Sequence, residues 1–226
     1  MTDDLKRQAA IAALDEIRSD MIVGLGTGST TAHFIRELAV RVRAGLKVVG
    51  IPTSEVSHRM ALEGGIPLTT LAAHSRIDVT VDGADEVSPQ LDLIKGLGGA
   101  LVREKIVAHA SERLVIIVDD AKLVDHLGAR TAIPVEVIPF ALEVVTLRLA
   151  DWGGQPLLRE REGKPFISDN GNYIIDWRYG EIAQPALLEQ QIKAITGVVD
   201  SGLFCQIAQL AIVAGSNGIR RIERKP

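Results

Sequence analysis

Short apolar runs alternate with amphipathic segments along roughly the first half of the chain. Helices are predicted where apolar side chains recur every three or four positions, at residues 4–18, 31–43, 54–63 and 100–110. Strands are predicted where short runs are mainly apolar or β-branched without a helical repeat, at 21–23, 47–51, 67–71, 77–81 and 114–118. Because continuous apolar runs are typical of parallel strands buried on both faces, this half predicts a Rossmann-like α/β domain with a parallel sheet.

The pattern changes near residue 130. Strands are expected at 133–138, 155–159, 172–177 and 198–204, and helices at 140–150 and 185–195. The resulting β-α-β-β-α-β order is that of the ferredoxin-like α+β unit. An apolar run at 208–214 is expected to return to the first sheet. We therefore predict an α/β domain at 1–130 and 205–226, with an inserted ferredoxin-like domain at 131–204.

Composition and charge narrow the class of protein. Hydrophobic residues make up 46% of the chain and the net charge is −4, which is ordinary for a soluble globular protein and gives no sign of a nucleic-acid partner. The basic run Arg220–Lys225 is interpreted as a solvated tail. No apolar stretch has the length of a membrane span, and the N-terminal residues do not resemble a signal peptide. A cytoplasmic protein without a membrane partner is expected.

Cysteine and histidine usage gives no sign of a metal centre. The single cysteine, Cys205, cannot form an intrachain disulfide and is interpreted as a small buried apolar residue. The five histidines are scattered without the spacing of a zinc site. Neither a metal nor a cofactor is expected.

The first segment with candidate chemistry is Gly24–Thr30, between a predicted strand and a predicted helix. Its three glycines let backbone N–H groups approach an anion, its three hydroxyl side chains add donors, and a helix N-terminus favours negative charge. A phosphate or carboxylate site is predicted. The alternative is a tight turn in which Ser29 or Thr30 caps the helix. The segment is neither a Walker loop nor a dinucleotide-binding fingerprint, because it lacks their lysine and third glycine.

The second segment, Asp82–Glu86, crowds three carboxylates at the end of an apolar strand. Carboxylates this close repel one another unless cations or donors compensate them, which favours a functional site over a capped turn. A divalent-metal site is an alternative, although no further carboxylate cluster accompanies the segment.

The third segment begins at Lys95, continues through a glycine-rich run to Ala100 and opens into the helix that carries Glu104. At about 100° per residue, Glu104 lies on an apolar helix face. That face is formed by Ala100, Leu101, Val107 and Ala108. Burial there would make the carboxylate a stronger base, which suits proton transfer. The alternative is a surface ion pair with a neighbouring lysine or arginine.

Lys122 follows a further strand and is interpreted as either a binding cation or a solvated lysine. In parallel sheets, ligands bind at the carboxyl ends of the strands, so these segments are expected to converge. An anion site, aspartates, a lysine and a half-buried glutamate suit enolisation next to a carbonyl, in which a base removes a proton and cations stabilise the oxyanion.

At these segments the sequence closely resembles the A-type ribose-5-phosphate isomerase family. The matching runs, in the family's order, are Gly24–Thr30, Val81–Glu86, Lys95–Lys105, Pro134–Pro139 and Ser168–Asn172. The resemblance implies an α/β domain with an inserted ferredoxin-like domain. It also implies interconversion of ribose 5-phosphate and ribulose 5-phosphate through an enediolate, without a metal, in a homodimer or homotetramer.

The resemblance further implies roles for individual residues. Glu104 would be the base that moves a proton between C2 and C1, Asp82 and Lys95 would help to open the ring and stabilise the oxyanion, and Asp85 would hold substrate hydroxyls. The implied substrate contacts are Thr27, Gly28, Ser29, Thr30, Asp82, Gly83, Ala84, Asp85, Lys95, Gly96, Leu97, Gly98 and Lys122. Lys6 matches a lysine that in the family can reach the phosphate.

One position departs from the family. Glycine is usual where this chain has Leu97. A leucine is strained there if the backbone needs a positive φ, and otherwise adds a wall to the pocket, which would change substrate preference or rate. The alternative functions are a non-catalytic sugar-phosphate sensor, an acyl-CoA transferase-like enzyme and an isomerase of another aldose phosphate. The presence of Glu104 and the lack of a helix-turn-helix segment argue against the sensor.

Overall fold

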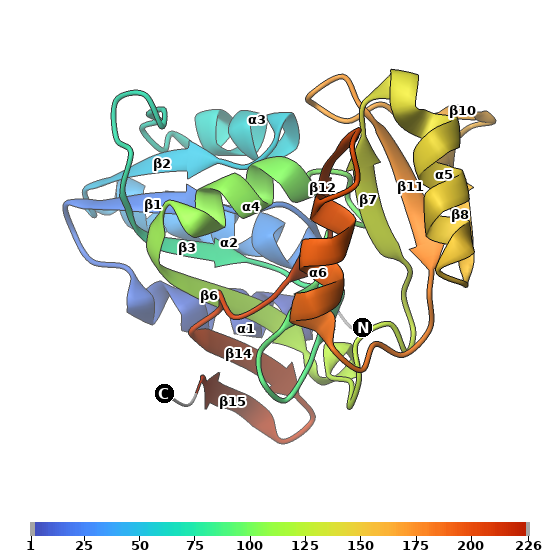
Figure 1. The fold of residues 1–226 in the computed structure, drawn as a ribbon. Coiled ribbons are helices and arrows are strands. Elements are labelled where there is room, and N and C mark those ends of the chain that lie inside the picture. Colours follow the sequence, from blue (N-terminus) through green and yellow to red (C-terminus); the bar gives the residue numbers. More distant parts are fainter. Residues whose placement is uncertain (1–2, 225–226) are drawn as a thin grey trace. The chain divides into compact units, whose positions relative to one another are not determined.

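The computed structural model describes residues 3–224, which form two compact units (Figure 1). The first unit comprises 3–84, 103–122 and 207–224, and the second comprises 85–102 and 123–206. The sequence had grouped 85–102 with the first domain. These residues belong to the second unit because their short strands pair with a strand at 203–204.

The first unit is built on a six-stranded sheet in the order β15-β14-β6-β3-β1-β2. Its strands are β1 (Met21–Leu25), β2 (Val48–Pro52), β3 (Ile77–Asp82), β6 (Ser111–Asp119), β14 (Leu210–Gly215) and β15 (Gly218–Glu223). All neighbours are parallel except β14 and β15. The chain reverses its direction of strand addition between β1 and β3, and this switch point is where open α/β sheets bind ligands.

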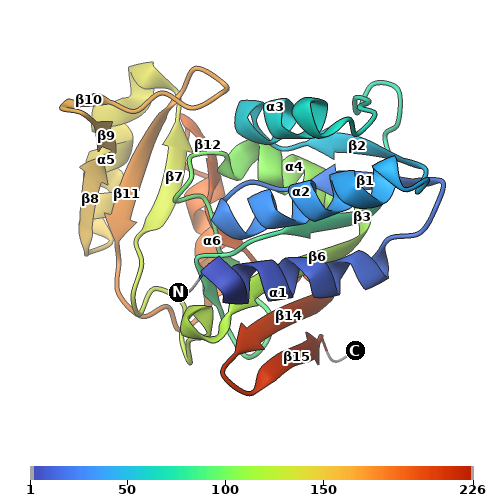
Figure 2. The same cartoon turned by 180° about the vertical axis from the view of Figure 1, so that it is seen from behind.

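Helices cover both faces of this sheet, as expected for a parallel sheet (Figures 1 and 2). They are α1 (Asp3–Ala13), α2 (Ser29–Arg43), α3 (Glu55–Gly64) and α4 (Leu101–His109), with short 3-10 turns at Leu14–Glu16 and Asp120–Lys122. Apolar side chains of α1, α2 and α3 share one buried core with the sheet. On the opposite face, Val107 of α4 packs against Ile51 and Ile77.

The second unit contains a four-stranded antiparallel sheet in the order β12-β7-β11-β8. Its elements are β7 (Ile133–Val137), a 3-10 turn (Pro139–Ala141), α5 (Leu142–Asp151), β8 (Gln155–Leu158), β11 (Tyr173–Arg178), α6 (Pro185–Lys193) and β12 (Val198–Ser201). This chain order and strand order confirm the ferredoxin-like prediction. Side chains of α5 and α6 pack on the sheet around Trp177 and Val135.

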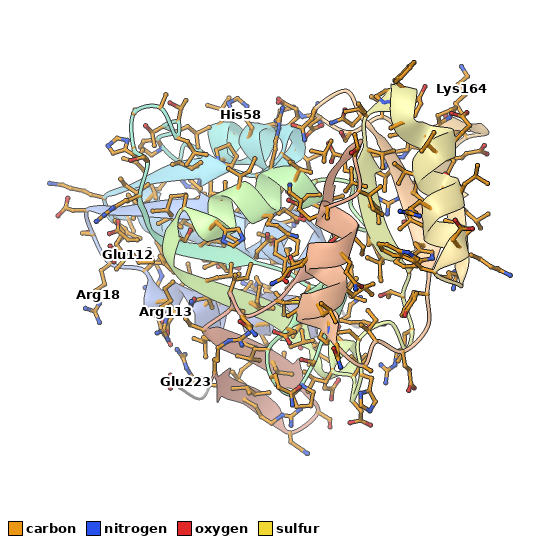
Figure 3. All side chains as sticks on the ribbon, viewed as in Figure 1. Arg18, His58, Glu112, Arg113, Lys164 and Glu223 are labelled. Carbon is orange, nitrogen blue, oxygen red and sulfur yellow. The ribbon has the colours of Figure 1, made fainter. Side chains whose placement is uncertain are left out.

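A sheet of three short strands and a two-stranded hairpin complete the second unit. β4 (Glu86–Val87), β5 (Leu93–Ile94) and β13 (Leu203–Phe204) form a small sheet, and β9 (Glu160–Arg161) pairs with β10 (Lys164–Pro165). Lys164 extends from this hairpin in Figure 3. Cys205 is buried, as predicted.

Two local predictions were wrong. The basic run from Arg220 lies in the edge strand β15, which pairs with β14 across a turn at Ser216-Asn217, rather than in a solvated tail; Lys225 lies outside the described residues. The missed signal is Asn217-Gly218, the dipeptide that favours tight hairpin turns. The strand expected at 67–71 is reduced to one bridge between Leu68 and Gly50. Within 3–224, no helix has the length and apolar character needed to cross a membrane.

Candidate functional site

The glycines after β1 allow close contact between neighbouring strands. A Cβ on Gly24 would lie 1.8 Å from Thr80 Oγ1, and a Cβ on Gly26 would lie 2.1 Å from Asp82 Oδ1. Real Cβ atoms essentially never come within 3.0 Å of another heavy atom. Glycine at position 26 therefore lets the loop after β1 lie directly against Asp82, at the switch point of the sheet.

Helix α2 begins at Ser29, two residues earlier than predicted, and its N-cap is Gly28 with a φ of 121°. No side chain caps this end of the helix, so the alternative in which Ser29 or Thr30 is the cap is wrong. The first N–H groups of a helix have no partner within the helix and carry partial positive charge. Gly28 and Ser29 are both exposed at this end of the helix, which is compatible with the predicted anion site.

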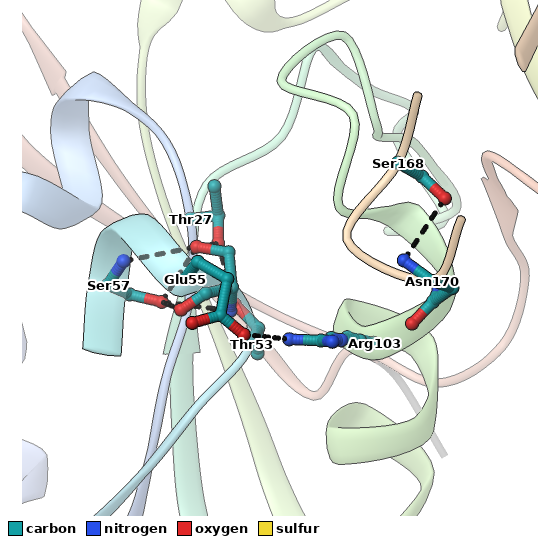
Figure 4. Close-up of polar contacts among 8 residues, drawn as sticks. Thr27, Thr53, Glu55, Ser57, Arg103, Ser168 and Asn170 are labelled. Carbon is teal, nitrogen blue, oxygen red and sulfur yellow. Dashed lines mark hydrogen bonds and ion pairs between the residues drawn. The ribbon is translucent and has the colours of Figure 1, made fainter. Parts of the chain in front are cut away.

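The hydroxyl of Thr27 joins a network that the sequence analysis missed (Figure 4). Thr27 Oγ1 lies 2.8 Å from Thr53 Oγ1 and donates to Ser54 Oγ at 2.7 Å. Ser54 in turn exchanges hydrogen bonds with Ser57 as the capping box of α3. The signal was present in the sequence, because Thr53 and Ser54 directly follow β2 as Gly26 and Thr27 follow β1.

A pocket of about 280 Å³ adjoins this network. Gly26–Ser29 line one side of it and Ser57 of α3 lines another. The remaining lining residues, Ala32, Ile35, Val56 and Met60, are apolar, so the polar groups of the loop lie at a pocket whose lining is mostly apolar.

Asp82 is the most deeply buried acidic residue of this part of the site, with 1% of its surface exposed. Its Oδ1 accepts hydrogen bonds from the backbone N–H of Thr27 at 3.0 Å and of Gly83 at 2.7 Å. Two donors to one carboxylate oxygen fix the orientation of the Asp82 side chain. The structure thus links the loop after β1 to the end of β3, and Gly83 and Ala84 follow as half-buried residues.

Glu104 lies on α4 with 4% of its surface exposed. Its predicted apolar face is buried, since Ala100, Leu101, Val107 and Ala108 are each at most 6% exposed. The preceding residue, Arg103, forms an ion pair with α3, because Arg103 Nη1 lies 2.9 Å from Glu55 Oε1 (Figure 4). The Arg103 guanidinium holds the pKa of Glu55 below its ordinary value.

The end of β6 contributes Asp119 and Lys122. Asp119 is 2% exposed and its Oδ1 accepts from the N–H of Ala121 at 2.7 Å. Lys122 is half-buried in the 3-10 turn that follows. The first unit therefore holds segments from the ends of β1, β2, β3 and β6 along one edge of its sheet.

The second unit holds Asp85 and the Lys95–Gly99 loop. Lys95 is 2% exposed, its N–H donates to the carbonyl of Gly202 at 2.8 Å, and its Nζ lies 5.5 Å from the centre of the Phe204 ring. The N–H of Leu97 donates to Asp85 Oδ2 at 3.0 Å. The loop and Asp85 thus form one hydrogen-bonded arrangement within this unit.

Leu97 is not among the non-glycine residues with a positive φ. The strained-backbone alternative is therefore excluded at this position. The side chain is 44% exposed, which is consistent with leucine adding apolar surface beside the loop.

Two runs that carried the family resemblance meet at Glu136 of β7. This side chain is fully buried, and its Oε1 accepts from Ser168 Oγ at 2.9 Å, Asn170 Nδ2 at 3.0 Å and Asn172 Nδ2 at 2.9 Å. The carboxylate therefore anchors the 168–172 turn. Among residues 3–224, no group of three or more His, Cys, Asp or Glu side chains is arranged to hold a metal ion.

Comparisons of this chain with family models and with known proteins all indicate the same family. The family model described as ribose 5-phosphate isomerase A (phosphoriboisomerase A) matches residues 49–218. "Ribose-5-phosphate isomerase A" of Rhodopseudomonas palustris strain HaA2 is 52% identical over 229 residues, covering 98% of both chains. The protein of the same name from Gloeobacter violaceus is 55% identical over 218 residues, covering 96% of this chain and 95% of its own.

Solved structures agree over the whole length. Ribose 5-phosphate isomerase A from Methanocaldococcus jannaschii has a TM-score of 0.95 and 42% identity, covering 99% of this chain and 100% of its own. A D-ribose-5-phosphate isomerase in complex with phospho-erythronic acid has a TM-score of 0.96 and 40% identity, with the same coverage. This chain therefore belongs to the ribose 5-phosphate isomerase A family of aldose–ketose isomerases.

Proposed function

We propose that this protein interconverts D-ribose 5-phosphate and D-ribulose 5-phosphate through an enediolate, with Glu104 as the base. The observation that carries the proposal is the buried carboxylate of Glu104 on α4, in the same unit as the glycine-rich loop and Asp82. A carboxylate that is poorly hydrated is a stronger base than one in water. The alternative of a sensor without a base is disfavoured by this placement.

The chemical steps follow from the open-chain aldose. Glu104 removes the proton from C2, the C–H electron pair forms the C1–C2 double bond, and the carbonyl oxygen on C1 takes up negative charge. The proton of the C2 hydroxyl then passes to the oxyanion on C1, and Glu104 returns its proton to C1 as the C1–C2 double bond breaks, so that C2 becomes the carbonyl and C1 carries the hydroxyl. Lys95 stabilises the oxyanion by its charge, and Asp82 exchanges the proton that opens the furanose ring.

Binding is proposed to use the remaining segments. The phosphate is bound by backbone and hydroxyl donors of Thr27–Thr30, which the uncapped start of α2 supports. Asp85 accepts hydrogen bonds from sugar hydroxyls. The further contacts proposed from the family are Gly83, Ala84, Gly96, Leu97, Gly98 and Lys122. A phospho-sugar acid is bound in a related structure, which fits a sugar-phosphate ligand.

The proposal is tested by incubating the purified protein with ribose 5-phosphate and following ketose formation. Glu104→Gln removes the base but keeps the size of the side chain, so kcat should fall by about 100-fold to 10,000-fold while binding of phospho-erythronic acid is retained. Glu112→Gln is the matched control, because Glu112 is exposed and points away from the sheet (Figure 3).

Full activity in Glu104→Gln would remove this residue from the mechanism. Binding without turnover by the unchanged protein would favour a sugar-phosphate sensor, and turnover of another aldose phosphate in preference to ribose 5-phosphate would change the substrate. Dialysis against a chelator should leave the rate unchanged, whereas a loss restored by a divalent cation would contradict metal-free isomerisation.

We also propose a cytoplasmic homodimer or homotetramer. Helix α5 and the turn before it expose Phe140 (96%), Val144 (67%) and Leu147 (67%), and contiguous exposed apolar side chains are typical of subunit interfaces. Light scattering should give a mass above that of one chain, and Leu147→Glu should lower it. A monomer at micromolar concentration would contradict the proposal.

A further inference from the structure

Arg159 makes an unusual set of hydrogen bonds in the second unit. Its Nη1 donates to the carbonyl oxygens of two consecutive residues, Gly96 at 2.9 Å and Leu97 at 3.1 Å. Its Nε donates to Asp176 Oδ2 at 2.9 Å, and its Nη2 donates to Asp176 Oδ1. Only 11% of the arginine side chain is exposed. Nothing in the sequence pattern singled out this residue, which follows β8.

The surroundings of Arg159 hold it in one orientation. A two-pronged ion pair with Asp176 fixes the plane of the guanidinium. The ring centre of Phe166 lies 5.8 Å from Arg159 Cζ. The Phe166 ring also occupies the space into which a Cβ on Gly99 would project, because that Cβ would lie 2.4 Å from Phe166 Cζ. Arg159 and Phe166 therefore hold the Lys95–Gly99 loop from one side.

The hydrogen bonds from Arg159 act on where the loop's N–H groups point, together with the turn hydrogen bond that the Gly99 N–H donates to the Gly96 carbonyl at 3.0 Å. The peptide bonds are trans, so each carbonyl oxygen and the N–H of the following residue point in opposite directions. Because the carbonyl of Gly96 accepts a hydrogen bond from Arg159, the N–H of Leu97 faces away from the guanidinium, and it donates to Asp85. With the carbonyl of Leu97 on Arg159, the N–H of Gly98 also faces away from the guanidinium. A charged donor on each carbonyl further polarises these peptides.

We propose that Arg159 is a positioning residue of the isomerase: it sets the Gly96–Leu97 and Leu97–Gly98 peptide planes so that Asp85 and the Gly98 N–H are oriented for the sugar. This inference rests on the proposed function, in which Asp85 and the loop contact the substrate. Arg159 itself does not touch the sugar. Asp176 acts indirectly, because it holds the Arg159 guanidinium in the orientation in which Nη1 donates to both carbonyls.

The test compares Arg159→Met with Arg161→Met. Arg161 is the matched control because its guanidinium also lies over the Phe166 ring, at 4.8 Å, while it is exposed and belongs to the β9–β10 hairpin. A misplacement of about 1 Å near a reacting group can cost about 100-fold, so Arg159→Met should lower kcat/KM by roughly 10-fold to 100-fold, and Arg161→Met by less than about 2-fold. The loss should fall mainly on KM, because the base is intact.

Two readouts separate positioning from a merely structural ion pair. In Arg159→Ala, added guanidinium ion should restore part of kcat/KM, and sodium chloride of equal ionic strength should not. Arg159→Lys should keep more activity than Arg159→Met. If Arg159→Met does not fold, Asp176→Asn replaces it, since it keeps the arginine but removes one charge of the pair. Equal kcat/KM in Arg159→Met, Arg161→Met and the parent would overturn the inference.

Hydrogen exchange distinguishes failure of the positioning role of Arg159 from failure of the proposed isomerase activity. Amide hydrogen exchange at Leu97 and Gly98 is measured in the ligand-free protein, and it should be at least about 10-fold faster in Arg159→Met than in Arg161→Met. An unchanged exchange rate would overturn the positioning role whatever the substrate is. Faster exchange in a protein that does not turn over ribose 5-phosphate would refute the proposed activity and leave the role of Arg159 in ordering the loop intact.

Discussion

Gly26→Ala tests how the switch point of the first sheet is built. The added Cβ would lie 2.1 Å from Oδ1, 2.2 Å from Cγ and 2.7 Å from Cα of Asp82. Reaching the 3.0 Å that real Cβ atoms keep requires a shift of at least about 0.9 Å, the difference between 3.0 and 2.1 Å. Rotation of the Asp82 side chain cannot supply the whole of it, because the Cα of Asp82 is also too close.

The cost follows from the contacts that this shift disturbs. Asp82 Oδ1 accepts from the N–H groups of Thr27 and Gly83. A hydrogen bond to a charged group contributes about 1.5–3 kcal/mol, and overpacking a close contact costs about 1–3 kcal/mol. Loss of one hydrogen bond with overpacking gives about 4 kcal/mol, or roughly 10 °C in Tm for a chain of this size.

The matched control is Gly83→Ala, which lies directly after Asp82 in the adjoining loop. A Cβ there would meet Thr31 Oγ1 at 3.7 Å and Ile117 O at 3.9 Å, which are ordinary contacts, and neither glycine has a left-handed φ. Gly83→Ala should therefore be neutral or stabilising by up to about 1 kcal/mol, through the lower entropy of the unfolded chain. Urea unfolding gives the free energy of unfolding of both variants, which should fall in Gly26→Ala and stay unchanged or rise in Gly83→Ala.

Activity gives a second measure. A displacement of about 1 Å at Asp82 should lower kcat/KM of folded Gly26→Ala by about 100-fold. The reasoning would be refuted by a Gly26→Ala protein whose unfolding free energy lies within about 1 kcal/mol of the parent and whose kcat/KM is unchanged, because the contact with Asp82 would then be easily relieved.

Three further substitutions test other contacts. Glu136→Ala leaves its three donors without an acceptor and should cost about 3 kcal/mol, whereas Glu136→Gln keeps an acceptor oxygen and should cost less; equal losses by urea unfolding would contradict this. Arg103→Met should raise the pKa of Glu55 toward 4.5, since the guanidinium now lowers it. The stabilisation from the Arg103–Glu55 pair is present above pH 4.5 and is lost as pH falls through the lowered pKa of Glu55. An NMR titration of Glu55 that is the same in Arg103→Met and in the parent would contradict this effect of Arg103. Trp177→Phe removes the 2.8 Å hydrogen bond from Nε1 to the carbonyl of Gly153 and should cost about 1–3 kcal/mol; an unchanged urea midpoint would mean that the bond contributes nothing.

The sequence by itself determined the architecture of both units. Continuous apolar runs such as 114–118 became fully buried parallel strands, because a strand covered on both faces leaves that local signature. The spacing of apolar residues around Glu104 predicted its burial for the same reason, since a helix repeats every 3.6 residues whatever it packs against. The ferredoxin-like strand order followed from the order of elements alone.

Tertiary structure decided which separate segments meet. The hydrogen bond from Thr27 to Asp82 depends on β1 lying beside β3, and the contact of Thr27 with Thr53 depends on β2 lying on the other side of β1. Arg159 reaches the carbonyl of Gly96 across 63 positions of the chain. No local pattern encodes such pairs, because a solvated arginine and one that orients a loop have the same neighbours in sequence. Strand order, register and side-chain packing bring them together, and those are properties of the whole fold.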